Sequence, residues 1–162
     1  MLAAALRDAF RNDRTIVVAL DGVQDPGNVG TIIRLAAAFD AGGVILTGGS
    51  ADPFAPKSIR ASAGAILALP VMAASRSALL EEAAANGFTL YAAASGEGRL
   101  EVPTSAAVIV FGSEGRGVSP ALLDAAKRIS IRTSPTIESL NVATAAAIVL
   151  QRSYEGRGGG SR

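Results

Sequence analysis

The chain of 162 residues contains no cysteine and no histidine. Without them it has no disulfide, no thiol nucleophile and none of the usual ligands of a zinc site. The absence of histidine also excludes every mechanism in which an imidazole acts as the general base. We therefore expect no metal, and a proton at any active site must be handled by other groups. A chain without cysteine is typical of a reducing compartment, so a cytoplasmic location is expected.

Charge of one sign is not in excess either. The chain has 15 lysines and arginines against 14 aspartates and glutamates, a formal net charge of +1, so no strong field indicates a nucleic-acid partner. Nearly all of the cations are arginines, which suit bidentate contacts with phosphate. The longest apolar stretches, such as residues 65–74, are too short to span a bilayer, and the N-terminal residues lack a signal-peptide core. We expect no membrane partner.

The remaining composition is that of one globular domain. Hydrophobic residues make up 49% and charged residues 18%, and the length suffices for one core. Patterns of apolar residues predict strands at 15–20, 43–47, 69–72, 88–93, 106–111 and 128–132. They predict helices at 2–10, 31–39, 56–62, 77–85 and 142–154, and another that begins at Pro120 with Ser119 as its cap. We find no repeat or linker, and we expect a single domain over residues 1–162 with a flexible tail at 156–162.

Strands that are apolar on both faces and alternate with helices predict an α/β fold with a mostly parallel sheet and helices on both faces. In such sheets ligands bind outside the carboxyl ends of the strands. Three loops there combine glycine with polar residues, at 25–30, 112–117 and 136–141. Ordinary turn chemistry explains any one of them, because glycine permits positive φ, and asparagine or serine caps helices. Three such loops at one edge of a sheet indicate a site.

Arg34 is the most conspicuous single residue. It lies between Ile33 and Leu35 on a helix predicted to be largely buried, where an arginine needs a partner. A snorkelling or structurally paired arginine is the alternative. Neither glycine loop matches G-x-G-x-x-G, and no Gly-Lys-Ser/Thr follows one, which excludes a P-loop. A dinucleotide-dependent oxidoreductase remains only as an irregular Rossmann-type variant.

Three motifs resemble those of the SpoU/TrmH family of RNA 2′-O-methyltransferases, in the SPOUT superfamily. Motif 1 is similar to DGVQDPGNVGTIIR at residues 21–34, motif 2 to FGSEGRGV at 111–118, and motif 3 to ESLNVA at 138–143. The stretch 57–64, which contains RASAG, also resembles the family. The matches are in family order and cover about residues 21–152.

The resemblance implies S-adenosylmethionine as cofactor, rRNA or tRNA as substrate and a ribose 2′-hydroxyl as methyl acceptor. It also implies a deep C-terminal trefoil knot, a rare exception to the rules of chain topology, and a homodimer with a shared active site. By motif match, the catalytic positions are Asn28, Arg34, Glu114, Ser139 and Asn141. The cofactor-binding positions are Gly112, Ile131 and Leu140.

The chain departs from the family at two places. It has Ile131-Arg132-Thr133 where Ile-Pro-Met is usual, and Pro135 where glycine is common, in the wall of the cofactor pocket. We expect this difference to affect cofactor affinity. Many relatives also carry an N-terminal RNA-binding domain that has no counterpart here. The weak net charge favours an excised catalytic domain over a minimal enzyme, with RNA affinity supplied elsewhere.

Methyl transfer needs alignment of nucleophile and methyl group and stabilisation of a developing alkoxide. Because a guanidinium stays protonated, we expect Arg34 to clamp the alkoxide and the neighbouring phosphate. Asn28 and Asn141 would orient Arg34 and the ribose, Glu114 would fix Arg34 or a loop, and Ser139 would bond near the reacting hydroxyl. The main alternative is a non-catalytic RNA-binding or partner subunit on the same fold. A dimer is also expected because the last helix has an apolar face to bury.

Overall fold

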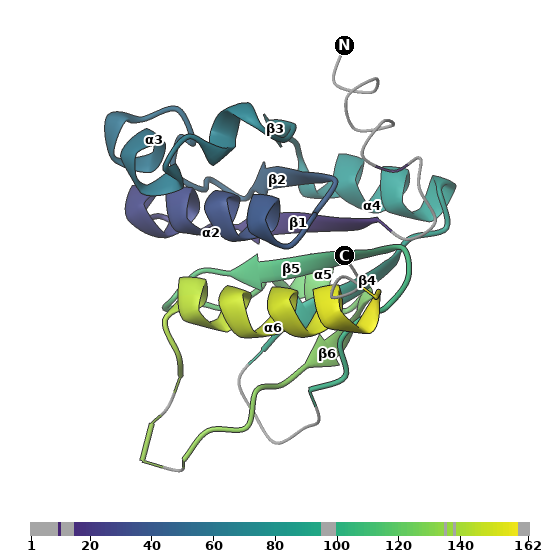
Figure 1. Ribbon diagram of the computed structural model, residues 1–162. Coiled ribbons are helices and arrows are strands. Elements are labelled where there is room, and N and C mark those ends of the chain that lie inside the picture. The colour runs from purple at the N-terminus through teal and green to yellow at the C-terminus, as the bar shows by residue number, and fades with distance from the viewer. Residues whose placement is uncertain (1–9, 11–14, 95–99, 135, 138, 159–162) are drawn as a thin grey trace.

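A computed structural model describes residue 10 and residues 15–94, 100–134, 136–137 and 139–158. In this part of the chain six strands form one sheet, with all neighbouring strands parallel and in the order β3-β2-β1-β5-β4-β6 (Figure 1). The strands are β1 (Ile16–Asp21), β2 (Gly43–Thr47), β3 (Val71–Ala73), β4 (Thr89–Ala93), β5 (Ala107–Gly112) and β6 (Ala126–Ile129). The predicted α/β class and parallel sheet are confirmed.

The centre of the sheet is the pair of β1 and β5, and every residue of β1 is buried. Both strands are almost entirely apolar because helices cover both faces of the sheet. Their register pairs Asp21 with Gly112, and Asp21 is paired with Thr47 of β2 on its other side. The carboxyl ends of three neighbouring strands therefore lie side by side, and the loops that follow them share one edge.

Two apolar cores lie on opposite faces of the sheet. On one face, α2 (Pro26–Ala38) and α6 (Val142–Gly156) pack against side chains that include Val18 and Ile109. On the other, α4 (Arg76–Ala85) and the short α5 (Pro120–Leu123) contribute Leu79 and Leu122 to a core with Val17. A further helix, α3 (Pro56–Ser62), and the 3-10 helix η1 (Ala65–Leu67) lie against α2.

The contact between α2 and α3 depends on a glycine. A Cβ atom at Gly30 would overlap the carbonyl oxygen of Ser58 and lie 2.7 Å from the Cβ of Ala61. At the start of the two helices, the Lys57 ammonium forms an ion pair with Asp25 at 2.6 Å. The stretch 57–64 is thus held directly against motif 1.

The start of α2 differs from the prediction, which placed residues 25–30 in a loop and began the helix at residue 31. The helix begins at Pro26, and the side chain of Asp25 caps it by accepting a hydrogen bond from the Gly27 amide at 3.0 Å. Aspartate before proline is a common way to begin a helix, and here it outweighs the two glycines that follow. Asn28 is consequently held on the first turn of a helix.

Smaller differences occur at other elements. β6 ends at Ile129 and not at residue 132, and the predicted strand at 69–72 is shifted to Val71–Ala73 behind η1. The predicted N-terminal helix lies outside the described residues apart from Phe10, which packs edge-to-face on Phe88. Gly156 belongs to α6 and not to a tail, whereas residues 159–162 lie outside the described part. Among the described residues, we find no helix with the length and apolarity needed to cross a bilayer.

The end of α6 is fastened to the end of α2. The guanidinium of Arg157 donates hydrogen bonds to the carbonyls of Phe39, at 2.8 Å, and Asp40, at 3.4 Å. The ring of Tyr154 packs near that of Phe39. Burial lowers the pKa of Arg157, and Asp40 and Tyr154 act in the opposite direction. Because of its bonds to Phe39 and Asp40, the guanidinium of Arg157 lies close to the carbonyl end of α2, where the helix dipole favours a cation.

We expect Arg157→Met to lower the free energy of unfolding by about 1–2 kcal/mol, since charged hydrogen bonds to the end of α2 are lost. Arg157→Lys, which keeps the charge but not the planar fork, should give an intermediate value. Urea denaturation followed by circular dichroism measures both. Wild-type stability in Arg157→Met would show that this fastening contributes nothing.

Candidate active site

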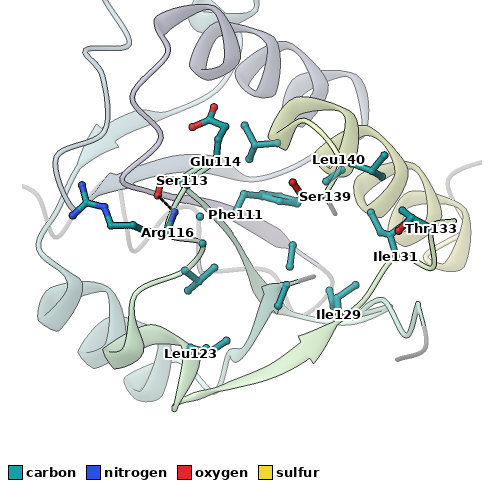
Figure 2. Close-up of a pocket in the computed structure, with 18 residues that line it drawn as sticks. Phe111, Ser113, Glu114, Arg116, Leu123, Ile129, Ile131, Thr133, Ser139 and Leu140 are labelled. Carbon is teal, nitrogen blue, oxygen red and sulfur yellow. Dashed lines mark hydrogen bonds between the residues drawn. The ribbon is translucent and has the colours of Figure 1, made fainter. Parts of the chain in front are cut away.

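A cavity of about 530 Å³ opens outside the carboxyl ends of β4, β5 and β6. The end of each strand contributes to its lining, with Ala93 from β4, Phe111 from β5 and Ile129 from β6. Figure 2 shows Ser113 and Arg116 on one side of it and Ile131 and Thr133 on the other. The volume is in the range of pockets that bind small molecules and cofactors, about 300–1,000 Å³.

The lining combines an apolar interior with a few polar groups. Phe111, Leu123, Ile129 and Leu140 supply apolar surface. The polar groups among the lining residues are Ser113, Glu114, Arg116, Thr133 and Ser139. Such a lining suits a ligand with one flat apolar part and one polar or charged part.

All three predicted cofactor positions lie at this one cavity. Gly112 ends β5, Ile131 follows β6, and Leu140 immediately precedes the cap of α6, yet each lines the same hollow. At the departure from the family pattern, Thr133 lines the cavity, whereas Arg132 is exposed and is not among its lining residues. Pro135 and Glu138 of the same segment lie outside the described residues.

The loop of residues 112–119 forms one wall of the cavity and turns sharply. Ser113 and Gly117 exchange backbone hydrogen bonds of 3.2 and 2.8 Å, and Gly117 has a φ of 67°. The Ser113 hydroxyl also accepts a bond from the Arg116 amide. A Cβ atom at Gly112 would overlap the backbone of Gly117 and Val118. The loop can return across the end of β5 only because residue 112 has no side chain.

Three of the predicted catalytic residues meet at the rim. The Asn28 amide donates to the Glu114 carboxylate at 2.5 Å, and the Asn141 amide donates to the Asn28 carbonyl oxygen at 3.4 Å. Asn141 also caps α6, because its side-chain oxygen accepts a bond from the Ala143 amide at 2.9 Å. Ser139 is exposed and lines the cavity two residues before this cap. One residue from each of the three motifs thus belongs to a single cluster.

Arg34 lies elsewhere, and the expectation that it is buried against a partner is wrong. It is exposed, and it makes no hydrogen bond or ion pair with any described residue. The buried face of α2 is formed by Val29, Ile32, Ile33 and Ala36. Residue 34 points away from that face, because sequence neighbours on a helix are about 100° apart. It is not among the residues that line the cavity, and Asn28 and Asn141 contact each other without it.

The sequence reasoning missed Asp21 and Arg76. Asp21 is only 2% exposed at the end of β1, and it forms an ion pair of 2.8 Å with Arg76 at the start of α4. A charged residue directly after an apolar run was the signal that could have indicated a buried ion pair. Asp21 was considered only as the first residue of motif 1.

Comparison with known proteins agrees with the motifs. The model of the SpoU rRNA Methylase family matches residues 15–151. The chain is 38% identical over 138 residues to the 23S rRNA (guanosine(2553)-2′-O)-methyltransferase RlmP of Bacillus subtilis, covering 83% of this chain and 56% of that protein. It is 37% identical over 142 residues to the 23S rRNA (adenosine(1067)-2′-O)-methyltransferase of Streptomyces laurentii, covering 84% of this chain and 53% of that protein.

A solved structure agrees as well. The AdoMet-bound rRNA methyltransferase from Sinorhizobium meliloti superposes with a TM-score of 0.85 at 33% identity, over 93% of this chain and 59% of that one. The chain spans about half the length of the curated relatives it matches. The family match removes the basis for an irregular Rossmann-type oxidoreductase. The chain belongs to the SpoU rRNA methylase family of RNA 2′-O-methyltransferases.

Proposed function

We propose that this chain binds S-adenosylmethionine in the 530 Å³ cavity and directs its methyl group to a ribose 2′-hydroxyl of rRNA or tRNA. The observation that carries the proposal is the convergence of Gly112, Ile131 and Leu140, from three segments, on one cavity outside the strand ends. Relatives that methylate 23S rRNA and a related structure that holds AdoMet support it.

The lining fits this cofactor. The apolar side chains of Ile131 and Leu140, together with backbone groups of the loops, suit a flat adenine, whereas Ser113 and Glu114 suit the polar amino-acid part. S-adenosylmethionine supplies an activated methyl group on a sulfonium. The protein's task is to orient the hydroxyl in line with that methyl group and to stabilise the oxygen as its charge develops. Ser139 lines the cavity, and in this proposal its hydroxyl bonds near the reacting hydroxyl.

The catalytic candidates lie in two places, which indicates two different roles. Asn28, Glu114 and Asn141 form the rim cluster, which would hold the loop and the ribose in place. Arg34 is exposed on α2 and does not line the cavity of its own chain. We infer that its guanidinium acts at the cavity of a second copy, as an electrostatic clamp on the alkoxide and the neighbouring phosphate.

The proposed homodimer therefore rests on Arg34. The other argument, from an apolar face on α6, adds less, because Val149 and Leu150 are buried in the chain's own core and only residues such as Ile148 stay partly exposed. The C-terminal trefoil knot and the cytoplasmic location remain predictions from the family resemblance and the composition. We also infer that residues 1–162 act as one catalytic domain, whose affinity for RNA is supplied by a separate part.

A calorimetric titration with S-adenosylmethionine tests the proposal. We expect saturable binding with one site per chain, and competition by S-adenosylhomocysteine, which keeps the adenosine and amino-acid parts. NADH serves as the control and should not bind. Absence of binding by a folded chain at millimolar cofactor, or preferential binding of the nicotinamide, would contradict the assignment of the cavity.

A further inference from the structure

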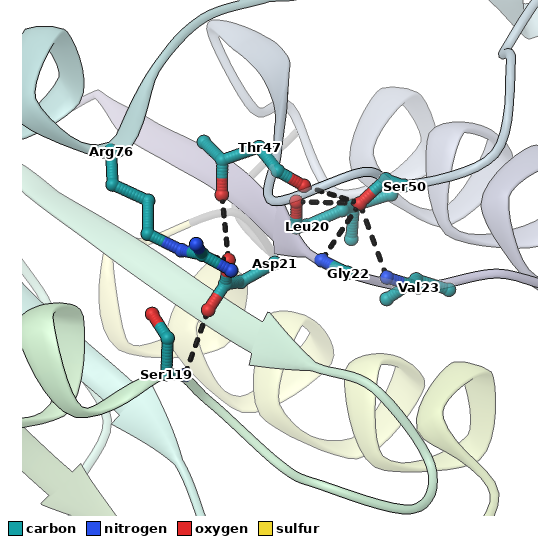
Figure 3. A network of polar contacts seen from close by, with 8 residues as sticks. All are labelled: Leu20, Asp21, Gly22, Val23, Thr47, Ser50, Arg76 and Ser119. Atoms are coloured by element: carbon teal, nitrogen blue, oxygen red, sulfur yellow. Dashed lines mark hydrogen bonds and ion pairs between the residues drawn. The ribbon is translucent and has the colours of Figure 1, made fainter.

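The buried carboxylate of Asp21, at the end of β1, joins this strand to three other parts of the molecule. Its Oδ1 accepts hydrogen bonds from the Thr47 hydroxyl at the end of β2, at 2.9 Å, and from Nε of Arg76, at 2.8 Å. Its Oδ2 accepts a hydrogen bond from the Ser119 amide at 2.8 Å (Figure 3). The guanidinium of Arg76 fits beside residue 48 because that residue is glycine. A Cβ atom there would overlap the guanidinium. One carboxylate thus fastens two strand ends, a helix start and the end of a loop.

These bonds keep the carboxylate in its charged form. Burial alone raises the pKa of Asp21, but hydrogen bonds from Ser119, Thr47 and Arg76 outweigh it and hold the pKa below its usual range. A charged acceptor forms stronger hydrogen bonds than a neutral one. The bond to the Ser119 amide is therefore a strong one, and the residue that accepts it is only 2% exposed.

The loop that Ser119 ends has a hollow on each side. Ser113, Arg116, Gly117 and Val118 line the 530 Å³ cavity, and the same four residues line a second cavity of about 210 Å³ that reaches Asp21. The loop is thus a partition between two cavities at Ser113, Arg116 and Gly117, while the side chain of Val118 is buried in the core. The reciprocal bonds between Ser113 and Gly117 are internal to the loop and do not connect it to the rest of the chain.

Two side chains from elsewhere in the described part of the chain bond this loop. Asn28 bonds Glu114 at the exposed rim, and Asp21 bonds Ser119 below the surface. Exposed hydrogen bonds compete with water and constrain position less than enclosed ones. Although Ser119 occupies the predicted cap position of α5, its side chain makes no capping bond. The contact of its amide with Asp21 ties this end of the loop to the end of β1, beside the apolar packing of Val118.

We propose that Asp21 is a positioning residue of the methyl-transfer site. Through the Ser119 amide it fixes the partition loop, residues 112–119, and thereby sets the affinity for S-adenosylmethionine. It does so without touching the cofactor, because it does not line the larger cavity. This inference rests on the proposed function, in that the larger cavity is taken as the cofactor site.

The test compares Asp21→Asn with Thr47→Val. Asparagine keeps the shape of residue 21 but lacks the negative charge. The hydrogen bonds from Arg76 and from the Ser119 amide are therefore weakened. Valine at 47 removes one bond to the same carboxylate from an equally buried residue of β2 that makes no hydrogen bond with the loop. Titration with S-adenosylmethionine, at a temperature where every variant is folded, gives Kd. Amide hydrogen exchange followed by NMR reports on Ser119 and residues 113–118.

For Asp21→Asn we expect Kd to rise on the order of tenfold and exchange at Ser119 to accelerate. For Thr47→Val we expect a Kd within about twofold of the wild type and unchanged exchange at Ser119, although both variants lose thermal stability. A purely structural role would lower the melting temperature of both and leave their Kd values alike. Equal Kd values for the two variants, or a wild-type Kd in Asp21→Asn, would therefore overturn the proposal.

Two other outcomes are also decisive. If Asp21→Asn does not fold, Arg76→Gln replaces it, since it weakens the hold on the carboxylate from a partly exposed position. We then expect a rise in Kd of about threefold, and a wild-type Kd overturns the inference. If the wild-type chain does not bind S-adenosylmethionine, the proposed function fails. Hydrogen exchange then remains as the test of whether Asp21 holds the loop through the Ser119 amide. Unchanged protection of Ser119 in Asp21→Asn then overturns it.

Discussion

Arg34→Ala is expected to lower the rate of methyl transfer to RNA by about 10²–10³-fold and to leave the affinity for S-adenosylmethionine within about twofold. The reason is the role proposed for Arg34 at the cavity of a second copy, where its guanidinium would stabilise charge that appears only in the transition state. The assay uses labelled cofactor and RNA, with the chain joined to an RNA-binding domain of a longer relative. Arg34→Lys should recover little, because an ammonium lacks the planar fork.

Mixing variants tests whether Arg34 acts at the second copy. In a heterodimer of Arg34→Ala and Ser139→Ala chains, one of the two sites has an intact cavity together with an intact Arg34 from the other chain. A statistical mixture should therefore regain about a quarter of the wild-type activity. No recovery on mixing, or a monomer in sedimentation at micromolar concentration, would contradict the shared site. Wild-type transfer by Arg34→Ala would remove Arg34 from the mechanism, and no transfer by any form that binds cofactor would favour the non-catalytic alternative.

Gly112→Ala is expected to abolish measurable binding of S-adenosylmethionine, raising Kd at least about 100-fold. The added Cβ would overlap the backbone of Gly117 and Val118, which has no flexible end to move aside. The loop would have to leave the end of β5, and the cavity wall would move with it. The sheet should remain intact, because the change lies at the last residue of a strand.

Gly115→Ala is the control in the same loop, at a residue that also lines the cavity. Nothing lies within 4 Å of a Cβ at residue 115, and its φ does not require glycine. We expect its Kd to stay within about twofold of the wild type. Calorimetry gives both values, and circular dichroism verifies folding. Similar affinities for the two variants would mean that the turn at Gly112 does not shape the cofactor cavity.

Local patterns predicted the elements well where their ends carry strong signals. β2 and α3 were predicted with their observed bounds, since Gly42 precedes one and Pro56 begins the other. The start of α2 was predicted too late because Gly27 and Gly30 favour a loop. The capping residue Asp25 and Pro26 at the first helical position, which favour a helix start, were given less weight. The burial of Arg34 was misjudged because its neighbours in sequence are not its neighbours on the helix face.

The candidate site was located by motif match, but its contacts were not foreseeable. Asn28 and Glu114 are 86 residues apart, and Asn28 and Asn141 are 113 apart, so only the folded sheet brings them together. Asn28 and Asn141 were expected to orient Arg34 and the ribose, and Glu114 to fix Arg34 or a loop. Within one chain these three residues hydrogen-bond one another. Asp21 was overlooked because its contact with the loop is made by the backbone amide of Ser119. Every residue except proline has such an amide, so the sequence does not indicate which one will bond Asp21.

The strand order has a consequence for how the chain reaches its fold. The central pair joins Ile16 to Ala107 and Asp21 to Gly112, so the middle of the sheet closes only after most of the chain has been synthesised. Until β5 arrives, β1 exposes an apolar edge that is able to pair with another chain. Contacts between such distant segments slow folding and prolong that exposure. The step most open to aggregation is therefore the insertion of β5 between β1 and β4, which also creates the edge where the site forms.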